Sequence, residues 1–188
     1  MQRDIIRTSC FDKALYALAT SRVYSWRASS KENWLKFNTC LGILIPSLVG
    51  GIVLTYGKEA QNLDLIIWVV GLLGLAQLVI SIISVVCAWE ESKNYYIESS
   101  ISNRNLFESF EHLAKFPPTS DDEFKDEFDK MVLREAWRND LDDKYPFDEK
   151  EERKGMRYSL RYFRRACATC NIIPPNMKTS DCDTCGNF

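Results

Sequence analysis

Histidine is almost absent from this chain, in which His112 is the only one among 188 residues. A single histidine cannot form a histidine cluster for a metal ion, and it gives no sign of a catalytic triad. His112 lies near Glu108 and Glu111 in a stretch with helical spacing, which is typical of an exposed helix face. Phosphate-loop, GxGxxG and HExxH patterns are missing as well. Together these absences predict a protein that is not an enzyme.

A large charge of one sign is also missing, because 24 Lys and Arg nearly balance 26 Asp and Glu. Charged side chains are absent altogether from two stretches, 37–56 and 65–89. A helix needs about 20 apolar residues to cross the hydrocarbon core of a bilayer, and both stretches are long enough. The sequence therefore predicts two membrane spans, at about 37–56 and 65–88. A buried hairpin of a soluble protein is the alternative, but so short a chain could hardly enclose it.

Basic residues flank the outer ends of these two stretches and predict their orientation. One basic residue, Lys58, lies in the linker, whereas the flanks contain Arg22, Arg27, Lys31, Lys36, Lys93 and Arg104. Because cytoplasmic flanks carry the excess of Lys and Arg, both termini are expected in the cytoplasm. No signal-peptide pattern precedes the first span, which is therefore expected to be a retained anchor.

Apolar residues at helical spacing dominate the rest of the chain, and no alternating run argues for a sheet. We expect an all-α membrane protein with four parts. Residues 1–33 form an amphipathic helical segment in the cytoplasm, either along the membrane or packed on later helices, and 34–89 form the transmembrane hairpin. Residues 90–166 form a cytoplasmic helical domain that continues the second span as a helix, and 167–188 form a zinc-ribbon-like tail with a short hairpin.

Two CxxC motifs near the end of the chain, Cys167 with Cys170 and Cys182 with Cys185, are separated by eleven residues. This spacing allows a hairpin that brings four thiolates to one tetrahedral Zn²⁺, which would be structural because no coordination position stays open. Gly186 follows the second motif, where a positive φ often turns backbone N–H groups toward the sulfurs. Two disulfides in an exported tail are the alternative, which the expected cytoplasmic location disfavours.

Small and polar residues form a stripe on the second apolar stretch, at spacings of three and four residues. The stripe consists of Gly74, Gln77, Ser81, Ser84 and Ala88. A polar side chain within hydrocarbon must face protein or water. The stripe therefore either lets helices pack closely or lines an aqueous pore, and a pore requires self-association because two spans cannot enclose a channel.

Arginines recur at helical spacing directly before the first CxxC motif, at Arg157, Arg161, Arg164 and Arg165. Guanidinium groups bind phosphate in a bidentate manner, so this arginine stripe could hold a nucleotide or nucleic acid. The alternative is that it pairs with the acid-rich region 121–152 or with a neighbouring subunit. Because acids and bases nearly balance, we favour pairing.

The hairpin, with an amphipathic helix before it and a helical segment after it, resembles the SLATT superfamily of two-transmembrane proteins from prokaryotic conflict systems. The tail is similar to the group described as mobilome proteins with a CxxCx(11)CxxC motif, through the spacing of its four cysteines. This resemblance implies an effector of bacterial anti-phage defence, which stays silent until infection and then assembles in the inner membrane and breaches it.

The expected function is thus that of an oligomeric effector that permeabilises or depolarises the bacterial inner membrane when triggered. Its expected partners are the lipid bilayer, further copies of itself, and a cytoplasmic regulatory partner or a nucleotide or nucleic-acid trigger from the same defence system. Two alternatives stay open. One is a membrane-tethered zinc module that binds nucleic acid or a nucleotide, and the other is a structural subunit of a larger membrane complex.

Overall fold

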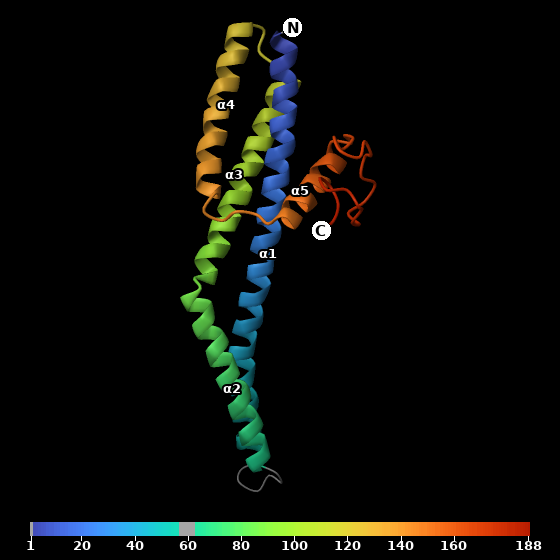
Figure 1. Ribbon diagram of the computed structural model, residues 1–188. Coiled ribbons are helices and arrows are strands. Elements are labelled where there is room, and N and C mark those ends of the chain that lie inside the picture. Colours follow the sequence, from blue (N-terminus) through green and yellow to red (C-terminus); the bar gives the residue numbers. More distant parts are fainter. Residues whose placement is uncertain (1, 57–62) are drawn as a thin grey trace. The chain divides into compact units, whose positions relative to one another are not determined.

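The computed structural model describes residues 2–56 and 63–188, and in that part of the chain all regular secondary structure is helical, as predicted. The helices are α1 (Gln2–Tyr56), α2 (Leu63–Val86), α3 (Trp89–Lys115), α4 (Asp121–Asp142) and α5 (Glu149–Tyr162), followed by the cysteine-containing tail (Figure 1). The linker at 57–62, with the Lys58 used to predict the membrane orientation, lies outside the described residues.

Contacts within the chain define two compact units. The helical unit consists of Met1–Trp26 and Tyr96–Phe188, and the hairpin unit consists of Arg27–Tyr95. These limits differ from the expected ones at 33 and 89, because α1 up to Trp26 packs on α3, α4 and α5 and continues without a break as one long helix. Of the two placements expected for the N-terminal helix, packing on later helices is the one observed.

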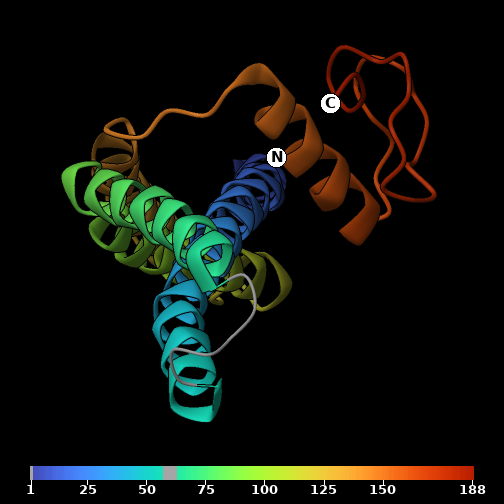
Figure 2. The same cartoon turned by 90° about the horizontal axis from the view of Figure 1, so that it is seen from below.

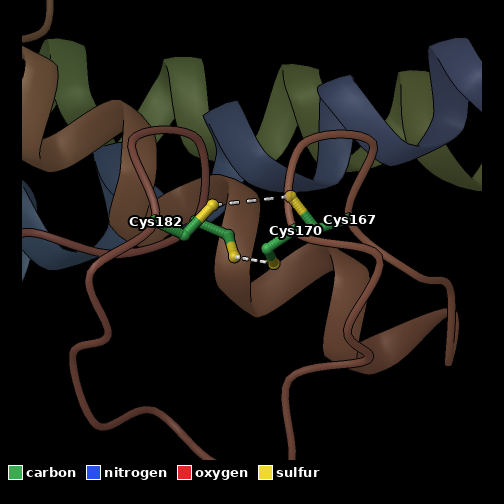
Figure 3. Close-up of side chains that lie close together, drawn as sticks. Cys167, Cys170 and Cys182 are labelled. Carbon is green, nitrogen blue, oxygen red and sulfur yellow. Dashed lines mark hydrogen bonds between the residues drawn. The ribbon is translucent and has the colours of Figure 1, made fainter.

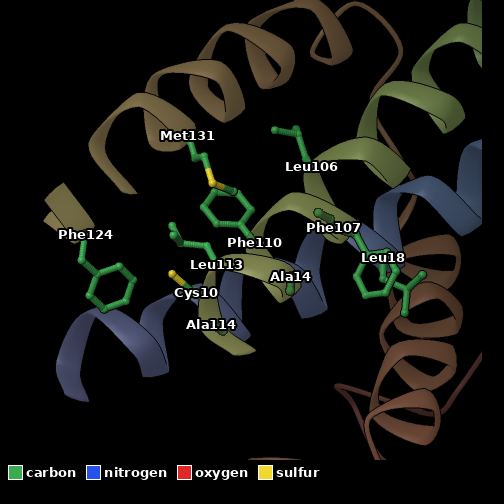
Figure 4. Close-up of a cluster of buried hydrophobic side chains, with 11 residues drawn as sticks. Cys10, Ala14, Leu18, Leu106, Phe107, Phe110, Leu113, Ala114, Phe124 and Met131 are labelled. Atoms are coloured by element: carbon green, nitrogen blue, oxygen red, sulfur yellow. The ribbon is translucent and has the colours of Figure 1, made fainter. Parts of the chain in front are cut away.

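The core of the helical unit forms where α1, α3 and α4 meet (Figure 4). On α1 the contact face is made of small and medium side chains, and on α3 and α4 it is made largely of aromatic and long ones. Its main members are Cys10, Ala14, Leu18, Leu106, Phe107, Phe110, Leu113, Phe124 and Met131. Small residues on one helix let the bulky ones of its neighbour approach, so the packing follows directly from the apolar faces of the three helices.

The hairpin unit contains the most apolar helix, α2. Within it, Ile67–Val86 is a 20-residue stretch of mean hydropathy 2.5 that is only 6% buried, and it is the one stretch among the described residues that is long and apolar enough to cross a membrane. The other predicted span, 37–56, is the end of α1, and its last part includes side chains outside the described residues. The two-span, multi-pass arrangement therefore stays a prediction.

The helix expected to run on from the second span is interrupted, so that part of the prediction is wrong. α2 ends at Val86, and Ala88 adopts a left-handed φ of 47° before α3 begins at Trp89. The backbone N–H of Ala88 donates to the carbonyl of Val85 at 3.0 Å, which closes a tight turn. A non-glycine residue with positive φ ends a right-handed helix because that helix requires negative φ at every residue.

Candidate metal centre and polar helix face

The two ends of α5 determine where the tail begins. At its start, Asp148 accepts a hydrogen bond from the backbone N–H of Glu151 at 2.7 Å, and the Glu151 carboxylate accepts one from the N–H of Asp148 at 3.2 Å. This capping box satisfies N–H groups that the helix itself leaves without partners. At its end, Arg164 takes a left-handed φ of 50°, which turns the chain out of the helix toward Cys167.

The four cysteine sulfurs of the tail converge on one point (Figure 3). The Sγ atoms of Cys167 and Cys182 are 3.9 Å apart, those of Cys170 and Cys185 are also 3.9 Å apart, and all four lie within 4.8 Å of one another. Four Zn–S bonds of about 2.3 Å in a tetrahedron place the sulfurs about 3.8 Å apart. A disulfide would need a separation of about 2.05 Å. The arrangement can therefore hold one metal ion, and Zn²⁺ fits it.

Hydrogen bonding and burial act in opposite directions on two of these thiols. The backbone N–H of Thr184 donates to the sulfur of Cys182 at 3.5 Å, and this contact is the main reason that the pKa of Cys182 is lowered to about 7. Cys185 is 1% exposed, and burial raises the pKa of its thiol. Because a metal binds the thiolate form, its binding would have to displace the proton that burial retains on Cys185.

Gly186 is required for a close contact and not for a positive φ, which corrects the expectation from sequence. A Cβ atom at this position would lie 2.0 Å from the carbonyl oxygen of Ser180. The left-handed residue is the next one, Asn187, with a φ of 55°, and Asn171 after the first motif has a φ of 54°. Asparagine is several-fold enriched in this region of φ, so each CxxC motif is followed by a residue suited to the turn.

Arg157 fastens the tail to α5 and is not available to phosphate. Its side chain is buried, and it donates to the carbonyl of Cys185 at 2.9 Å, to Ser180 Oγ at 3.0 Å and to the carbonyl of Asn176 at 2.8 Å. Three hydrogen bonds to one loop use most of the donors of a guanidinium group. The residue therefore helps to hold the loop that carries Cys182 and Cys185.

The rest of the arginine stripe is divided between pairing and exposure. Arg165 forms an ion pair with Asp12 of α1, which is neither in the acid-rich region 121–152 nor in another subunit. Arg161 and Arg164 are exposed and make no ion pair within the described part of the chain. The stripe thus does not act as one surface, because its members point to different surroundings.

The tail lacks the short hairpin that a zinc-ribbon-like module would have. Residues 163–188 contain turns and irregular backbone, without a strand (Figure 2). The first motif is closed by backbone bonds from Cys167 N–H to the carbonyl of Ile172 at 3.1 Å and from Asn171 N–H to the carbonyl of Cys167 at 2.9 Å. The second motif is closed in the same way, by backbone bonds from Gly186 N–H to the carbonyl of Cys182 and from Asn187 N–H to the carbonyl of Ser180, both at 2.8 Å.

The polar stripe on α2 is turned toward α1 within the hairpin unit. The side-chain nitrogen of Asn38 donates to Ser81 Oγ at 3.2 Å, and Ser84 is buried. A Cβ added to Gly42 would come within 2.7 Å of the amide nitrogen of Gln77, so the missing side chain of Gly42 leaves room for Gln77. Within this unit these polar side chains therefore contribute to the packing of α2 on α1.

The two ends of the predicted stripe do not share this contact. No atom lies within 4 Å of a Cβ built on Gly74, so that position faces open space. Ala88 lies in the turn after α2, where its left-handed φ takes it out of the helical register. The contact with α1 is therefore made by the middle of the stripe.

The cysteine spacing of this tail also appears in the description of the family that matches the chain. The model of the mobilome CxxCx(11)CxxC protein family matches residues 7–188. The chain belongs to this family. No curated protein and no solved structure matches it. Because the match spans the helices as well as the cysteines, this mobilome protein shares more with its family than the metal-binding motif.

Two polar groups of this mobilome protein escaped the reasoning from sequence. Asn38 lies in the uncharged stretch 37–56, where lack of charge predicts only a span, yet its amide donates to Ser81 on α2. Asp142 belongs to the acid-rich region 121–152, yet it is 8% exposed and accepts hydrogen bonds from Ser99 at 2.6 Å, Asn103 at 2.7 Å and Arg138 at 2.5 Å. The signal in the sequence is the spacing of four residues within two pairs, Ser99 with Asn103 and Arg138 with Asp142. That spacing places the members of each pair on one helix face.

Proposed function

We propose that this mobilome protein is a membrane effector of a bacterial anti-phage defence system, which oligomerises and permeabilises or depolarises the inner membrane when triggered. In this proposal α2 and residues 37–56 form a transmembrane hairpin, with both termini in the cytoplasm. The observation that carries the proposal is the inverted pattern of α2, whose polar side chains meet α1 while its large apolar ones are exposed.

Exposure of the apolar residues on α2 is extensive. Trp68 is 79% exposed, Leu72 72% and Val85 80%. Soluble proteins rarely leave a contiguous apolar surface of this kind uncovered, because its contact with water is unfavourable. A bilayer or neighbouring copies of the same helix would cover it, and both are parts of the proposal.

The contact between Asn38 and Ser81 supports a resting state in which the polar stripe of α2 is in contact with α1. Within hydrocarbon these two side chains satisfy each other, and the Gln77 side chain fills the space beside Gly42. To line a water-filled path, Gln77 and Ser81 would have to leave α1 and turn toward the axis of an oligomer. Activation would therefore exchange a contact within one chain for contact with water.

The cysteine tail and the helical unit are proposed to restrain this exchange or to receive the trigger. The tail can hold a structural Zn²⁺, which would keep the loop bonded by Arg157 in one conformation. The family description supports a link to mobile genetic elements through the word mobilome, and the likeness to the SLATT superfamily supports a role in conflict between bacteria and phages.

The test measures membrane potential with a voltage-sensitive dye in living bacteria during induced expression, at matched membrane levels. The intact chain is expected to depolarise the cells, and Gln77→Leu with Ser81→Leu is expected to prevent this. A matched control is Leu75→Ile with Leu78→Ile, because both residues are exposed on the same helix, and it should depolarise like the intact chain. Equal depolarisation by all three would exclude the polar stripe as the path. Intact chain that leaves the membrane potential unchanged both on induced expression and during phage infection would contradict the whole proposal.

A second candidate function rests on Arg161 and Arg164. Both are exposed beside the cysteine tail and without an ion pair in the described chain, so they could bind the phosphates of a nucleic acid or nucleotide. Binding of the full chain to labelled single-stranded DNA or RNA that weakens with salt, and that is lost in Arg161→Gln with Arg164→Gln, would favour this function. Absence of binding even at low salt would rule it out.

A further inference from the structure

A cavity of about 260 Å³ opens between α3 and α4 in the helical unit. Ser102, Asn105 and Ser109 line it from α3, and Arg134 and Trp137 line it from α4. Spacings of three and four residues place each set on one face of its helix. Below them, Leu106 and Arg138 complete the lining.

Apart from Arg138, the polar side chains that line this cavity have no partner among the described residues. The side chains of Ser102, Asn105 and Ser109 make no hydrogen bond there, and Arg134 makes no ion pair there. A polar group without a protein partner must bind water or a ligand, since leaving it unbonded is unfavourable. Three hydrogen-bonding groups and one cation are therefore free at the same opening.

Arg134 provides the uncompensated charge of the site. The guanidinium of Arg138 is buried and is neutralised by Asp142 at 2.5 Å and by Glu98 at 3.4 Å. Glu135, the next residue along α4, is in an ion pair with Lys13. Because these neighbouring acids already have basic partners, Arg134 is left to attract an anion.

Trp137 gives the same opening a flat aromatic surface. Its side chain is 64% exposed and takes part in no ring contact within the described residues. It follows Arg134 by three residues on one helix, so the indole and the guanidinium lie on neighbouring parts of one surface. Exposed tryptophan is well suited to stack on a planar ring, and this stacking tolerates different rings.

We propose that this cavity binds a small phosphorylated ligand that contains a planar ring, such as a mononucleotide or an aryl phosphate. Trp137 stacks on the ring, Arg134 binds the phosphate, and the hydroxyl and amide groups of Ser102, Asn105 and Ser109 bond the polar edge of the ligand. The volume lies just below the usual range of ligand pockets, which starts at about 300 Å³, and therefore selects a single small molecule over a polymer. The binding does not depend on the membrane activity proposed above.

The test is isothermal titration of the full chain in lipid nanodiscs with four probes: AMP, phenyl phosphate, adenosine and inorganic phosphate. At least one of the two ring phosphates is expected to bind more tightly than both adenosine and inorganic phosphate. Tighter binding of AMP would identify a nucleotide as the ligand, and tighter binding of phenyl phosphate would identify a simple aryl phosphate. Inorganic phosphate that binds as tightly as either of them, or no binding of either at millimolar concentration, would overturn the proposal.

Variants assign the binding to the cavity. Arg134→Gln and Trp137→Ala should each weaken binding at least about fivefold, whereas Trp137→Phe should retain most of it because a ring remains. Lys125→Gln is the matched control, since it removes another exposed cation of α4 that does not line the cavity and should leave the affinity unchanged. Both cavity side chains are exposed, so their loss should not unfold the helices, which circular dichroism checks. Unchanged affinity in Arg134→Gln and Trp137→Ala would overturn the assignment.

Discussion

In the helical unit, Phe110 and Phe124 are fully buried, whereas in the hairpin unit Trp68 and Leu72 are among the most exposed side chains. The polar groups show the opposite trend in the hairpin, where Ser81 bonds Asn38 of α1 and Ser84 is buried. Both units contain amphipathic or apolar helices, but they turn their apolar side chains to different surroundings. The comparison shows that one chain contains one unit that covers its own apolar side chains and another that leaves them exposed.

Substitution of the tail cysteines should have the largest effect of the four changes, because it removes metal ligands from the tail. Replacing Cys167 and Cys170 together with serine removes half of the ligand set, and metal binding contributes about 10–16 kcal/mol to the folding of small zinc modules. The tail is expected to lose its bound zinc and its resistance to proteases, as measured by metal analysis and limited proteolysis. The control is Cys40→Ser with Cys87→Ser, because both cysteines are exposed and lie in the hairpin unit. A tail that kept its zinc and its resistance would contradict the metal site.

Truncation of a large apolar residue should affect the two units very differently. Phe110→Ala removes a fully buried ring and is expected to lower the free energy of unfolding of the helical unit by about 3–5 kcal/mol. Leu72→Ala, at a 72% exposed position of α2, should leave that free energy unchanged. Denaturant unfolding followed by hydrogen exchange of α3 measures both. Similar losses in the two variants would remove the distinction between the units.

High pH should weaken the helical unit through Cys10. Burial raises the pKa of its thiol from 9.0 to about 11. Between these values the unfolded chain loses this proton while the folded chain keeps it, so the free energy of unfolding decreases as pH rises from 9 toward 11. The decrease should reach about 2 kcal/mol and should be absent in Cys10→Ala. Denaturant titrations at roughly pH 8, 9, 10 and 11 give the free energy of unfolding of the intact chain and of Cys10→Ala. An identical pH dependence in the two proteins would exclude Cys10 as the cause.

The smallest expected effect concerns the hydrogen bond inside the hairpin. Ser81→Ala removes the partner of Asn38, and such bonds between membrane helices average about 0.6 kcal/mol. Ser47→Ala is the matched control, because Ser47 is exposed on α1 and bonds only its own helix, at the carbonyl of Ile43. Unfolding of the hairpin in bicelles should show a loss for Ser81→Ala and none for Ser47→Ala. Equal stability of the two would show that the polar contact contributes nothing to packing.

Much of the helical architecture could be read from local patterns. The periodic apolar residues indicated helices, and the spacing of Cys167, Cys170, Cys182 and Cys185 indicated one metal site, because a CxxC motif constrains its own two sulfurs and a short loop joins the pairs. The turn at Ala88 could not be read in this way, since alanine favours helices and only the surrounding structure stabilises its positive φ.

The arginine stripe shows why side-chain roles were harder to predict. Periodicity placed Arg157, Arg161, Arg164 and Arg165 close together, but it could not show that the first binds the tail loop, that the last pairs with Asp12, or that the other two stay exposed. Those roles depend on residues distant in sequence, such as Asp12 of α1, which is brought near by packing.

The sequence by itself determined that the chain is helical, that the stretch within α2 is apolar enough to cross a membrane, and which four cysteines could hold one metal ion, because these properties depend on neighbours along the chain. Only the tertiary structure decided that Asn38 meets Ser81, that Asp142 is buried among α3 and α4, and that Arg134 and Trp137 border one cavity. Such contacts join residues far apart in sequence, and their partners are selected by close packing and by the need to satisfy every buried polar group.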